Sequence, residues 1–405
     1  MNDLDTVVIA GGGLAGANAA FALRDLGFQR RVILVGEESG APYERPALSK
    51  GYLRGEKVAD ELLVRPPGDY ETAGVELLRA TRAVTLDPAT RQLNLADGTS
   101  LRYDALLIAT GAAPRRLRTR PNLDGVHYLR DLPDADALRA AAAQARRIAV
   151  VGGGWIGSEV AASLRQMGGD VTLIADRVRP LERVLGSEVA EIYRQVHLEH
   201  GVRLVRGRVA AAVGDARVKG LQLADGRRVE TDLVVVGIGA VPRLEFATRA
   251  GLETRNGAIA TDEFLRSSDP NVYAAGDVAT VWHPRYGRHL HVEHWDTAIR
   301  QGKAAAANIV GAGTPYLRTP YFYSDQFELG MEYRGFAPEW GTVVIRGDVA
   351  ARRFYAFWLT DSRVAAAMNV NLWEDGAALR RLVESERRVD PSRLADPGVP
   401  LIEAA

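Results

Sequence analysis

The sequence predicts an α/β protein in which one nucleotide-binding unit is used twice and a smaller α+β domain follows. Two glycine-rich turns support this, at residues 11–16 (Gly-Gly-Gly-Leu-Ala-Gly) and 152–157 (Gly-Gly-Gly-Trp-Ile-Gly). Each follows a short apolar run, at 7–10 or 148–151, and precedes a helical pattern, at 17–26 or 159–167. A strand, a GxGxxG turn and a helix form a Rossmann-like pyrophosphate site, because the helix N-terminus faces the anion. Two such turns indicate two dinucleotides, most simply a flavin and a nicotinamide.

An internal repeat fixes how the chain is divided. Residues 96–115 and 224–243 share Ala-Asp-Gly, a later Asp, and then Gly-Ala-x-Pro-Arg at the same positions. Each copy has an Asp-Gly turn between extended segments, followed by a buried-strand run that ends in glycine. We therefore expect residues 1–111 to form the first unit and 112–243 the second, with the chain returning to the first unit over 244–320.

The remaining elements follow from apolar runs and their breaks. Strands are expected at 31–35, 170–174, 258–261 and 271–275, and a helix at 296–310. The composition changes after a Gly/Pro-containing break at 311–320. Residues 321–405 then carry strand patterns at 342–345, 353–359 and 364–370 and a helix at 375–385. The predicted whole is a glutathione-reductase-like architecture with a C-terminal α+β domain.

Composition excludes several classes of protein. The chain has 405 residues, a formal net charge of zero and no apolar run near the ~18 residues of a membrane span. Nothing global therefore points to nucleic acid or a membrane, and acidic residues at the N-terminus predict a cytoplasmic protein without a signal peptide. The chain has no cysteine. It cannot relay electrons through a cysteine pair or hold its own iron–sulfur cluster on thiolates, so electrons must leave the flavin for an external acceptor.

Further runs complete a family pattern. They are Pro-Tyr-Glu-Arg-Pro-Ala-Leu-Ser-Lys at 42–50, Ala-Thr-Gly at 109–111, Tyr-Leu-Arg at 128–130, Gly-Asp at 276–277, Glu-His-Trp at 293–295 and Tyr-Ser-Asp-Gln at 323–326. With these runs the chain resembles the NAD(P)H-dependent ferredoxin reductases of bacterial dioxygenase and cytochrome P450 systems, the putidaredoxin reductase-like family. The resemblance implies FAD at the first glycine turn, NADH at the second with NADPH possible, and transfer of electrons to a [2Fe–2S] ferredoxin that feeds a cytochrome P450 or Rieske oxygenase. Residues 1–111 with 244–320 become the FAD-binding domain, 112–243 the NAD(P)H-binding domain and 321–405 the interface domain.

The expected FAD-binding residues combine the fold's chemistry with the resemblance. Gly11, Gly13 and Gly16 would hold the pyrophosphate, Glu37 at the end of the second strand would bind the adenosine ribose, and Asp277 would bind the ribityl hydroxyls. The resemblance implies that Arg45 and Arg130 contact the phosphates or the adenosine half, and that Trp295 and Tyr323 pack against the flavin. It adds Lys50, Thr110 and Gly111 as further cofactor-binding positions.

Lys50 and Glu159 are the expected catalytic pair. Lys50 ends the most specific motif, and a cation near a reduced flavin stabilises its negative charge. Glu159 lies two residues beyond Gly157, in the first turn of its helix, where the helix dipole favours a carboxylate. The resemblance places Glu159 near flavin and nicotinamide and pairs it with Lys50.

The nicotinamide site departs from the family pattern. Gly152, Gly154 and Gly157 would hold the pyrophosphate, but Ala175 stands where the family has the Glu that binds the 2′-hydroxyl. Asp176 can replace that carboxylate, whereas Arg177 and Arg179 can hold a 2′-phosphate. We expect NADH to be preferred, with weak discrimination.

Other features leave alternatives open. The spacing of His289, His291 and His294 resembles a metal site, but the segment reads as a strand and no metal is expected.

A basic docking rim for ferredoxin is expected from Arg300, Lys303 and Arg334. A rubredoxin, quinone or ascorbate-radical reductase, or an interaction flavoprotein of the apoptosis-inducing-factor type, uses the same fold.

Overall fold

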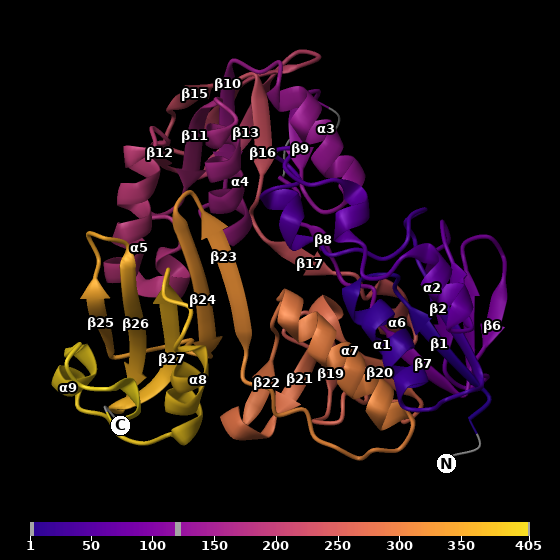
Figure 1. The fold of residues 1–405 in the computed structure, drawn as a ribbon. Helices are drawn as coiled ribbons and strands as arrows, with labels where there is room; N and C mark the ends of the chain where they lie inside the picture. The colour runs from indigo at the N-terminus through magenta and orange to yellow at the C-terminus, as the bar shows by residue number, and fades with distance from the viewer. Residues whose placement is uncertain (1–3, 118–122, 404–405) are drawn as a thin grey trace. The chain divides into compact units, whose positions relative to one another are not determined.

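The structure is a computed structural model that describes residues 4–117 and 123–403 (Figure 1). It divides into two compact units, each formed from three segments of the chain. The first unit comprises residues 1–45, 59–113 and 240–318, and the second comprises 46–58, 114–239 and 319–405. Each unit contains one of the two glycine turns.

A five-stranded parallel sheet forms the centre of the first unit, in the order β20-β7-β1-β2-β3. Its strands are β1 (Thr6–Ala10), β2 (Arg31–Val35), β3 (Val75–Leu78), β7 (Ala105–Ile108) and β20 (Val272–Ala274). The buried runs are almost wholly apolar, as expected for parallel strands covered on both faces. Helices α1 (Leu14–Asp25) and α7 (Trp295–Ile309) cross closely, and glycine at position 302 permits this approach. A Cβ at Gly302 would lie only 2.2 Å from the Ala15 carbonyl oxygen.

Smaller elements complete the first unit. They are the meander β4 (Ala83–Asp87), β5 (Gln92–Leu95) and β6 (Ser100–Arg102), the sheet β18 (Thr254–Arg255), β19 (Ala258–Thr261), β21 (Ala279–His283) and β22 (Arg288–Leu290), and helices α2 (Pro67–Thr72) and α6 (Glu245–Arg249). Strand β8 (Ala112–Pro114) pairs with β17 (Ala240–Pro242). The expected helix at 296–310 and strands at 31–35, 258–261 and 271–275 are all confirmed to within two residues.

The second unit repeats the same plan. Its parallel sheet has the order β12-β11-β10-β16-β9, built from β9 (Val126–Tyr128), β10 (Arg147–Val151), β11 (Asp170–Ala175), β12 (Arg203–Arg206) and β16 (Leu233–Val236). Helices α3 (Leu132–Ala142) and α4 (Trp155–Gln166) pack on it, and β13 (Val209–Gly214), β14 (Val218–Leu223) and β15 (Arg228–Glu230) form a meander. The Asp-Gly turns of the two meanders match, since Gly98 and Gly226 both have a φ of +89°. The α/β class with two Rossmann-like parts is therefore confirmed.

The C-terminal part of the second unit is an antiparallel sheet in the order β23-β24-β27-β26-β25. Its strands are β23 (Tyr321–Gln326), β24 (Leu329–Gly335), β25 (Thr342–Asp348), β26 (Arg353–Thr360) and β27 (Arg363–Val370). Helix α5 (Glu182–Glu199) covers one face, where the Trp358 indole donates to the Leu185 carbonyl at 3.1 Å. Helices α8 (Gly376–Ser385) and α9 (Pro391–Ala395) cover the other.

Two strands of this sheet, β23 and β24, were not among the predicted elements. The fully buried positions of β23 are the polar residues Ser324 and Gln326, each 1% exposed, so the strand lacks the apolar alternation that marks its neighbours. Within the described residues, no helix has the length and apolar character needed to cross a membrane.

Candidate functional site

The first glycine turn is shaped by close backbone contacts. Gly11 has a φ of +133°, and a Cβ there would lie 2.1 Å from the Ala109 carbonyl oxygen. A Cβ on Gly16 would lie 2.0 Å from the Gly11 oxygen. At Gly13, in contrast, a Cβ would meet nothing within 4 Å, and this residue is the N-cap of helix α1 and provides no side-chain hydrogen bond to it. An open approach to uncapped helix N–H groups fits the pyrophosphate of a dinucleotide.

The second turn has the same geometry. Gly152 has a φ of +115°, with the Gly237 oxygen 2.2 Å from its would-be Cβ, and a Cβ on Gly157 would lie 1.8 Å from the Gly152 oxygen. Gly154 is the N-cap of α4, provides no side-chain hydrogen bond to it, and faces open space. The two turns are equivalent sites, so the chain has the backbone for two dinucleotides, one in each unit.

Glu37 follows β2 at the place expected for a ribose-binding carboxylate. Its side chain is paired with the Arg243 guanidinium, and Arg82 lies 4.0 Å from its other oxygen. Arg243 also ties two predicted residues together: its carbonyl accepts from the Thr110 hydroxyl at 2.6 Å, and its N–H donates to the Gly111 carbonyl at 2.9 Å. Arg243 ends the repeated Gly-Ala-x-Pro-Arg run but was not among the predicted site residues, and it connects three predicted cofactor-binding positions of the first unit.

Arg45 and Asp277 also belong to the first unit. The Arg45 guanidinium lies 2.6 Å from a Glu38 oxygen, and the Tyr43 hydroxyl donates to the same carboxylate at 2.7 Å. Asp277 follows Gly276, whose would-be Cβ lies 3.3 Å from Ala15 in the first turn of α1. The structure therefore places Asp277 close to the N-terminus of the helix that carries the first glycine turn.

The segment before α7 contains the expected Trp295 and the histidines with metal-like spacing. The ring Nε2 of His291 lies 2.9 Å from the Asp277 carbonyl oxygen, so this nitrogen faces the backbone. Burial lowers the pKa of His294 to about 4, against a weaker opposing effect of Asp277. Trp295 is the first residue of α7. Among the described residues no group of three or more side chains is arranged to hold a metal ion.

The second unit brings Lys50 and Glu159 together, as the resemblance implied. The Lys50 ammonium lies 2.7 Å from Glu159 Oε2, with side chains 12% and 4% exposed. The Ser49 hydroxyl donates to the same oxygen at 2.6 Å, and the Ser324 hydroxyl donates to Glu159 Oε1 at 2.7 Å. A buried carboxylate is stable only when paired and hydrogen-bonded in this way. The three donors come from the 46–50 segment and from β23, which both contact α4.

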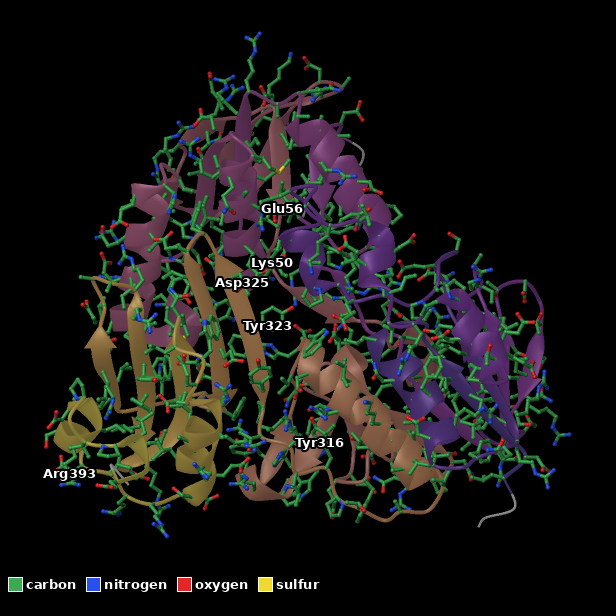
Figure 2. All side chains as sticks on the ribbon, in the orientation of Figure 1. Lys50, Glu56, Tyr316, Tyr323, Asp325 and Arg393 are labelled. Atoms are coloured by element: carbon green, nitrogen blue, oxygen red, sulfur yellow. The ribbon has the colours of Figure 1, made fainter. Side chains whose placement is uncertain are left out.

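One aromatic residue, Tyr323, and one acidic residue, Asp325, complete the cluster around Lys50 and Glu159. The Tyr323 ring centroid lies 5.6 Å from the Lys50 ammonium, a cation–π distance. Figure 2 shows Lys50, Tyr323 and Asp325 on neighbouring segments of the second unit. Burial raises the pKa of Asp325, an effect that Lys50 opposes and Glu159 reinforces. The cluster therefore holds one cation among two carboxylates and an aromatic ring.

A buried polar chain continues beyond Ser324 and was not predicted. The Gln326 amide donates to the Ser324 hydroxyl at 3.2 Å, and the Gln326 oxygen lies 3.0 Å from His197 Nε2. Burial lowers the pKa of His197 to about 4. Ser324 and Gln326 lie in the Tyr-Ser-Asp-Gln run that carries the resemblance, which was the available signal, whereas His197 had none.

Three further predicted residues lie in the second unit, near the ends of its strands. Asp176 and Arg177 follow β11, and Asp176 is paired with Arg183 of α5. Arg130 follows β9, and its backbone N–H donates to the Asp134 carboxylate at 2.9 Å. Arg130 and the glycine turn thus lie in the same unit, while the expected FAD residues Glu37 and Asp277 lie in the other.

The expected docking residues differ in exposure. Lys303 is exposed on α7, and Arg300 is half exposed while paired with Asp296 at 3.2 Å. The expectation for Arg334 is wrong, because its side chain is only 11% exposed and its guanidinium binds Glu332 and Asn369, both at 2.7 Å. Arg334 holds strands β24 and β27 together instead of facing a partner.

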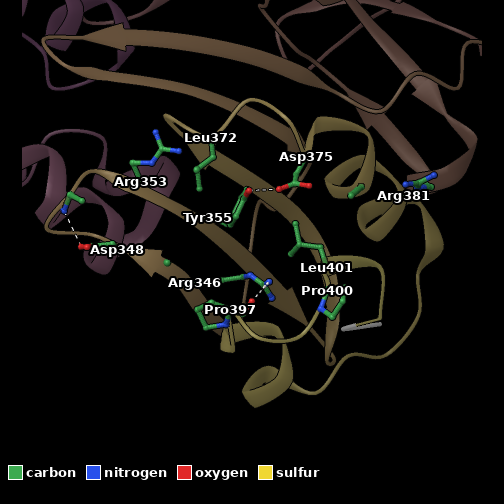
Figure 3. A pocket seen from close by; sticks show the side chains of 13 residues that line it. Arg346, Asp348, Arg353, Tyr355, Leu372, Asp375, Arg381, Pro397, Pro400 and Leu401 are labelled. Carbon is green, nitrogen blue, oxygen red and sulfur yellow. Dashed lines mark hydrogen bonds between the residues drawn. The ribbon is translucent and has the colours of Figure 1, made fainter.

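A pocket of about 820 Å³ lies on the C-terminal sheet (Figure 3). Its walls come from β25, β26 and the segments around α8 and α9, and the Tyr355 hydroxyl donates to Asp375 inside it. The buried Arg346 guanidinium donates to the Val399 carbonyl at 2.7 Å. None of the residues predicted for cofactor binding or catalysis lines this pocket.

Known proteins match nearly the whole length of this chain. Residues 5–302 match the pyridine nucleotide-disulphide oxidoreductase family and 321–405 the reductase C-terminal domain. The chain is 40% identical over 407 residues to the ferredoxin–NAD(+) reductase component of an anthranilate 1,2-dioxygenase system from Burkholderia cepacia, covering 98% of both chains.

Two solved structures share the fold along nearly the full length. The ferredoxin reductase for the CYP199A2 system of Rhodopseudomonas palustris is 35% identical, with a TM-score of 0.95 over 99% of this chain and 100% of that one. The reductase in a covalent putidaredoxin reductase–putidaredoxin complex is 34% identical, with a TM-score of 0.93 over 99% and 98%. The chain therefore belongs to the pyridine nucleotide-disulphide oxidoreductase family and, within it, to the putidaredoxin reductase-like ferredoxin reductases.

Proposed function

We propose that the protein is an FAD-dependent ferredoxin–NAD(P)+ reductase that passes electrons from a reduced nicotinamide to a [2Fe–2S] ferredoxin serving an oxygenase or cytochrome P450. It acts in the cytoplasm. Residues 1–111 with 244–320 form its FAD-binding domain, 112–243 its NAD(P)H-binding domain and 321–405 its interface domain. Bound FAD supplies the redox chemistry, taking two electrons as hydride and passing them on singly.

The protein's own residues bind, orient and supply charge. Gly11, Gly13 and Gly16 present the α1 N-terminus to the FAD pyrophosphate, and Gly152, Gly154 and Gly157 do the same for the nicotinamide coenzyme. The other cofactor-binding positions are Glu37, Arg45, Lys50, Thr110, Gly111, Arg130, Asp277, Trp295, Tyr323, Asp176 and Arg177. Glu37 is ion-paired with Arg243, and Arg45 is ion-paired with Glu38. In this proposal the two ion pairs provide the charged groups that bind the adenosine half of FAD.

Lys50 and Glu159 are the catalytic pair in this proposal. Lys50 places a cation where negative charge develops on reduction, in a region with little solvent exposure. Glu159 holds that cation in place and is itself fixed by Ser49 and Ser324. No general acid or base is needed for hydride transfer, so charge and orientation are the protein's contribution.

The observation that carries the proposal is the pair of equivalent uncapped glycine turns in a chain without cysteine. Two dinucleotide sites allow a nicotinamide to reduce a flavin within one chain. Without a cysteine pair the electrons cannot continue through a dithiol, as they do in disulfide reductases. The electrons must therefore pass to an external acceptor, and the relative named above is a ferredoxin–NAD(+) reductase component, which favours ferredoxin.

Anaerobic mixing with NADH tests the proposal. The flavin absorbance band should bleach rapidly, and cytochrome c should then be reduced only when a [2Fe–2S] ferredoxin is added. Slow formation of a long-lived charge-transfer complex would favour an interaction flavoprotein instead. Ferredoxin-independent reduction of quinone or rubredoxin would identify a different reductase on the same fold.

A further inference from the structure

The segment that follows β11 folds back onto the second glycine turn. The backbone N–H of Leu181 donates to the Gly153 carbonyl at 2.8 Å, and a Cβ on Gly153 would lie 2.8 Å from the Ala175 Cβ. Leu181 is 2% exposed and has a left-handed φ of 64°, so the chain turns sharply into α5 at this point. Residues 176–183 are therefore anchored beside the turn that faces the coenzyme pyrophosphate.

Asp176 directly follows Ala175, the position at which the family carries its ribose-selecting carboxylate, and it is the first residue beyond the end of β11. Such a carboxylate accepts hydrogen bonds from the 2′-hydroxyl of NADH and repels the 2′-phosphate of NADPH. In this chain the carboxylate is already paired with the Arg183 guanidinium, in the first turn of α5. The side chains are 50% and 67% exposed, so both groups are accessible to a coenzyme.

The other arginines of this segment are not equivalent to Arg183. Arg179 donates to Glu191 at 2.8 Å and lies 3.8 Å from Glu182, so its guanidinium is held along α5. Arg177 is 51% exposed and has a longer contact, at 3.8 Å, with Glu182. Residues 176–183 contain two carboxylates and three guanidinium groups, a net charge of 3 − 2 = +1.

We propose that Arg183 is the residue that determines coenzyme discrimination, an inference that rests on the proposed reductase function. Its guanidinium offsets the charge of Asp176 and offers the planar donor pair that binds a phosphate group. The carboxylate that would exclude NADPH is thereby neutralised, and Arg177 adds a second cation beside it. The protein therefore accepts NADPH with a kcat/KM within about tenfold of that for NADH. A tenfold difference corresponds to about 1.4 kcal/mol, the size expected for one hydrogen-bonded contact.

The test replaces Arg183 by Gln and uses Arg203→Gln as a matched control. Arg203 is ion-paired with Asp170 at 2.7 Å, with side chains 56% and 45% exposed, so its environment resembles that of Arg183. Asp170 begins β11 and Asp176 follows its end, so the two ion pairs flank opposite ends of one strand. Both variants remove one exposed positive charge from the same unit, and only one removes it beside the glycine turn.

Two measurements on the FAD-loaded protein decide the matter. The first is the ratio of kcat/KM for NADH to that for NADPH, which Arg183→Gln should raise about tenfold and Asp176→Asn should lower. The second is calorimetric binding of 2′,5′-ADP and 5′-AMP, which need no redox step. Arg183→Gln should weaken 2′,5′-ADP binding about tenfold and change 5′-AMP binding little, whereas Arg203→Gln should change neither.

Equal effects of the two arginine variants, or a ratio that moves less than about twofold, would overturn the role of Arg183. Failure of the reductase proposal has a different signature, because neither coenzyme would then bleach the flavin in any variant. In that case the comparison of 2′,5′-ADP with 5′-AMP still tests the assignment of Arg183.

Discussion

The Lys50 ammonium contacts Glu159 Oε2 at 2.7 Å, in a region where the two side chains are 12% and 4% exposed. Such a pair is stable while both partners are present, but removing one leaves an uncompensated buried charge. Glu159 has two further donors in Ser49 and Ser324, whereas Lys50 has Glu159 as its charged hydrogen-bond partner. Changes at the two positions should therefore have different consequences.

Lys50→Met should lower the flavin midpoint potential. Removing a cation near the reduced ring destabilises its negative charge, and a charge-assisted contact of about 1.5–3 kcal/mol corresponds to about 30–60 mV for a two-electron couple. Spectroelectrochemical titration of the FAD-loaded protein measures the shift. Lys57→Met, at an exposed position seven residues along the chain, is the control and should leave the potential unchanged. Equal potentials for both variants and wild type would place Lys50 away from the flavin.

Glu159→Gln should slow hydride transfer or weaken nicotinamide binding while FAD is retained. Glutamine can still accept from Ser324 but cannot neutralise Lys50, so the position and charge of the ammonium change. Stopped-flow reduction over a range of NADH concentrations separates the two effects. Glu188→Gln, at an exposed position on α5, is the control. An unchanged reductive half-reaction would remove Glu159 from the catalytic pair.

Gly13→Val and Gly154→Val should separate the two dinucleotide sites. A Cβ at either glycine meets no protein atom within 4 Å, so both variants should fold, but branched side chains would occupy the approach of the pyrophosphate. Gly13→Val should be purified with much less FAD. Gly154→Val should retain FAD and bind 5′-AMP or NADH at least about tenfold more weakly. Flavin content and calorimetry measure these effects, and loss of FAD from Gly154→Val would show that the sites are misassigned.

Acid should destabilise the protein through His197. Burial depresses its folded pKa to about 4, below the ordinary 6.5, so between these values the unfolded chain binds a proton that the folded chain does not. The contribution of His197 to stability is fully present above pH 6.5 and decreases by about 3 kcal/mol as the pH falls to 4. Thermal unfolding midpoints measured from pH 7 to 4 should decline less steeply in His197→Gln than in wild type. If the unfolding midpoints of the variant and the wild type declined in parallel, His197 would not be the cause of the acid destabilisation.

Ferredoxin turnover should depend on salt more strongly than flavin reduction does. An exposed cation such as Lys303 acts mainly on the association of an acidic partner, and salt screens that attraction. Lys303→Glu should raise the apparent KM for ferredoxin severalfold and leave the KM for NADH unchanged. Lys219→Glu changes the same charge in the β14 strand and is the control. Turnover that is insensitive to salt and to both reversals would indicate an apolar docking surface.

Local sequence patterns were sufficient to predict much of the fold. Strands β1, β2 and β10 are apolar runs that are each followed by a glycine, and helices α1 and α4 begin at Leu14 and Trp155, inside the glycine-rich runs and earlier than the expected 17 and 159. These features depend on neighbours within a few residues, and backbone conformation at Gly11 and Gly152 demands glycine. The repeated Asp-Gly turns followed from the same local chemistry. The resemblance supplied the Lys50–Glu159 pair.

Tertiary structure decided which groups surround those residues. Ser324 donates to Glu159 across 165 residues of sequence, and it lies on β23, whose buried positions are polar and therefore gave no strand signal. The sequence showed that Asp176 is acidic, but only the fold shows that the sharp turn at Leu181 brings Arg183 of α5 against it. Hydrogen bonds and ion pairs between distant segments depend on the path of the backbone between them. Residue type and local spacing therefore determine the turns and strands, and the packing of the whole unit determines which charges meet.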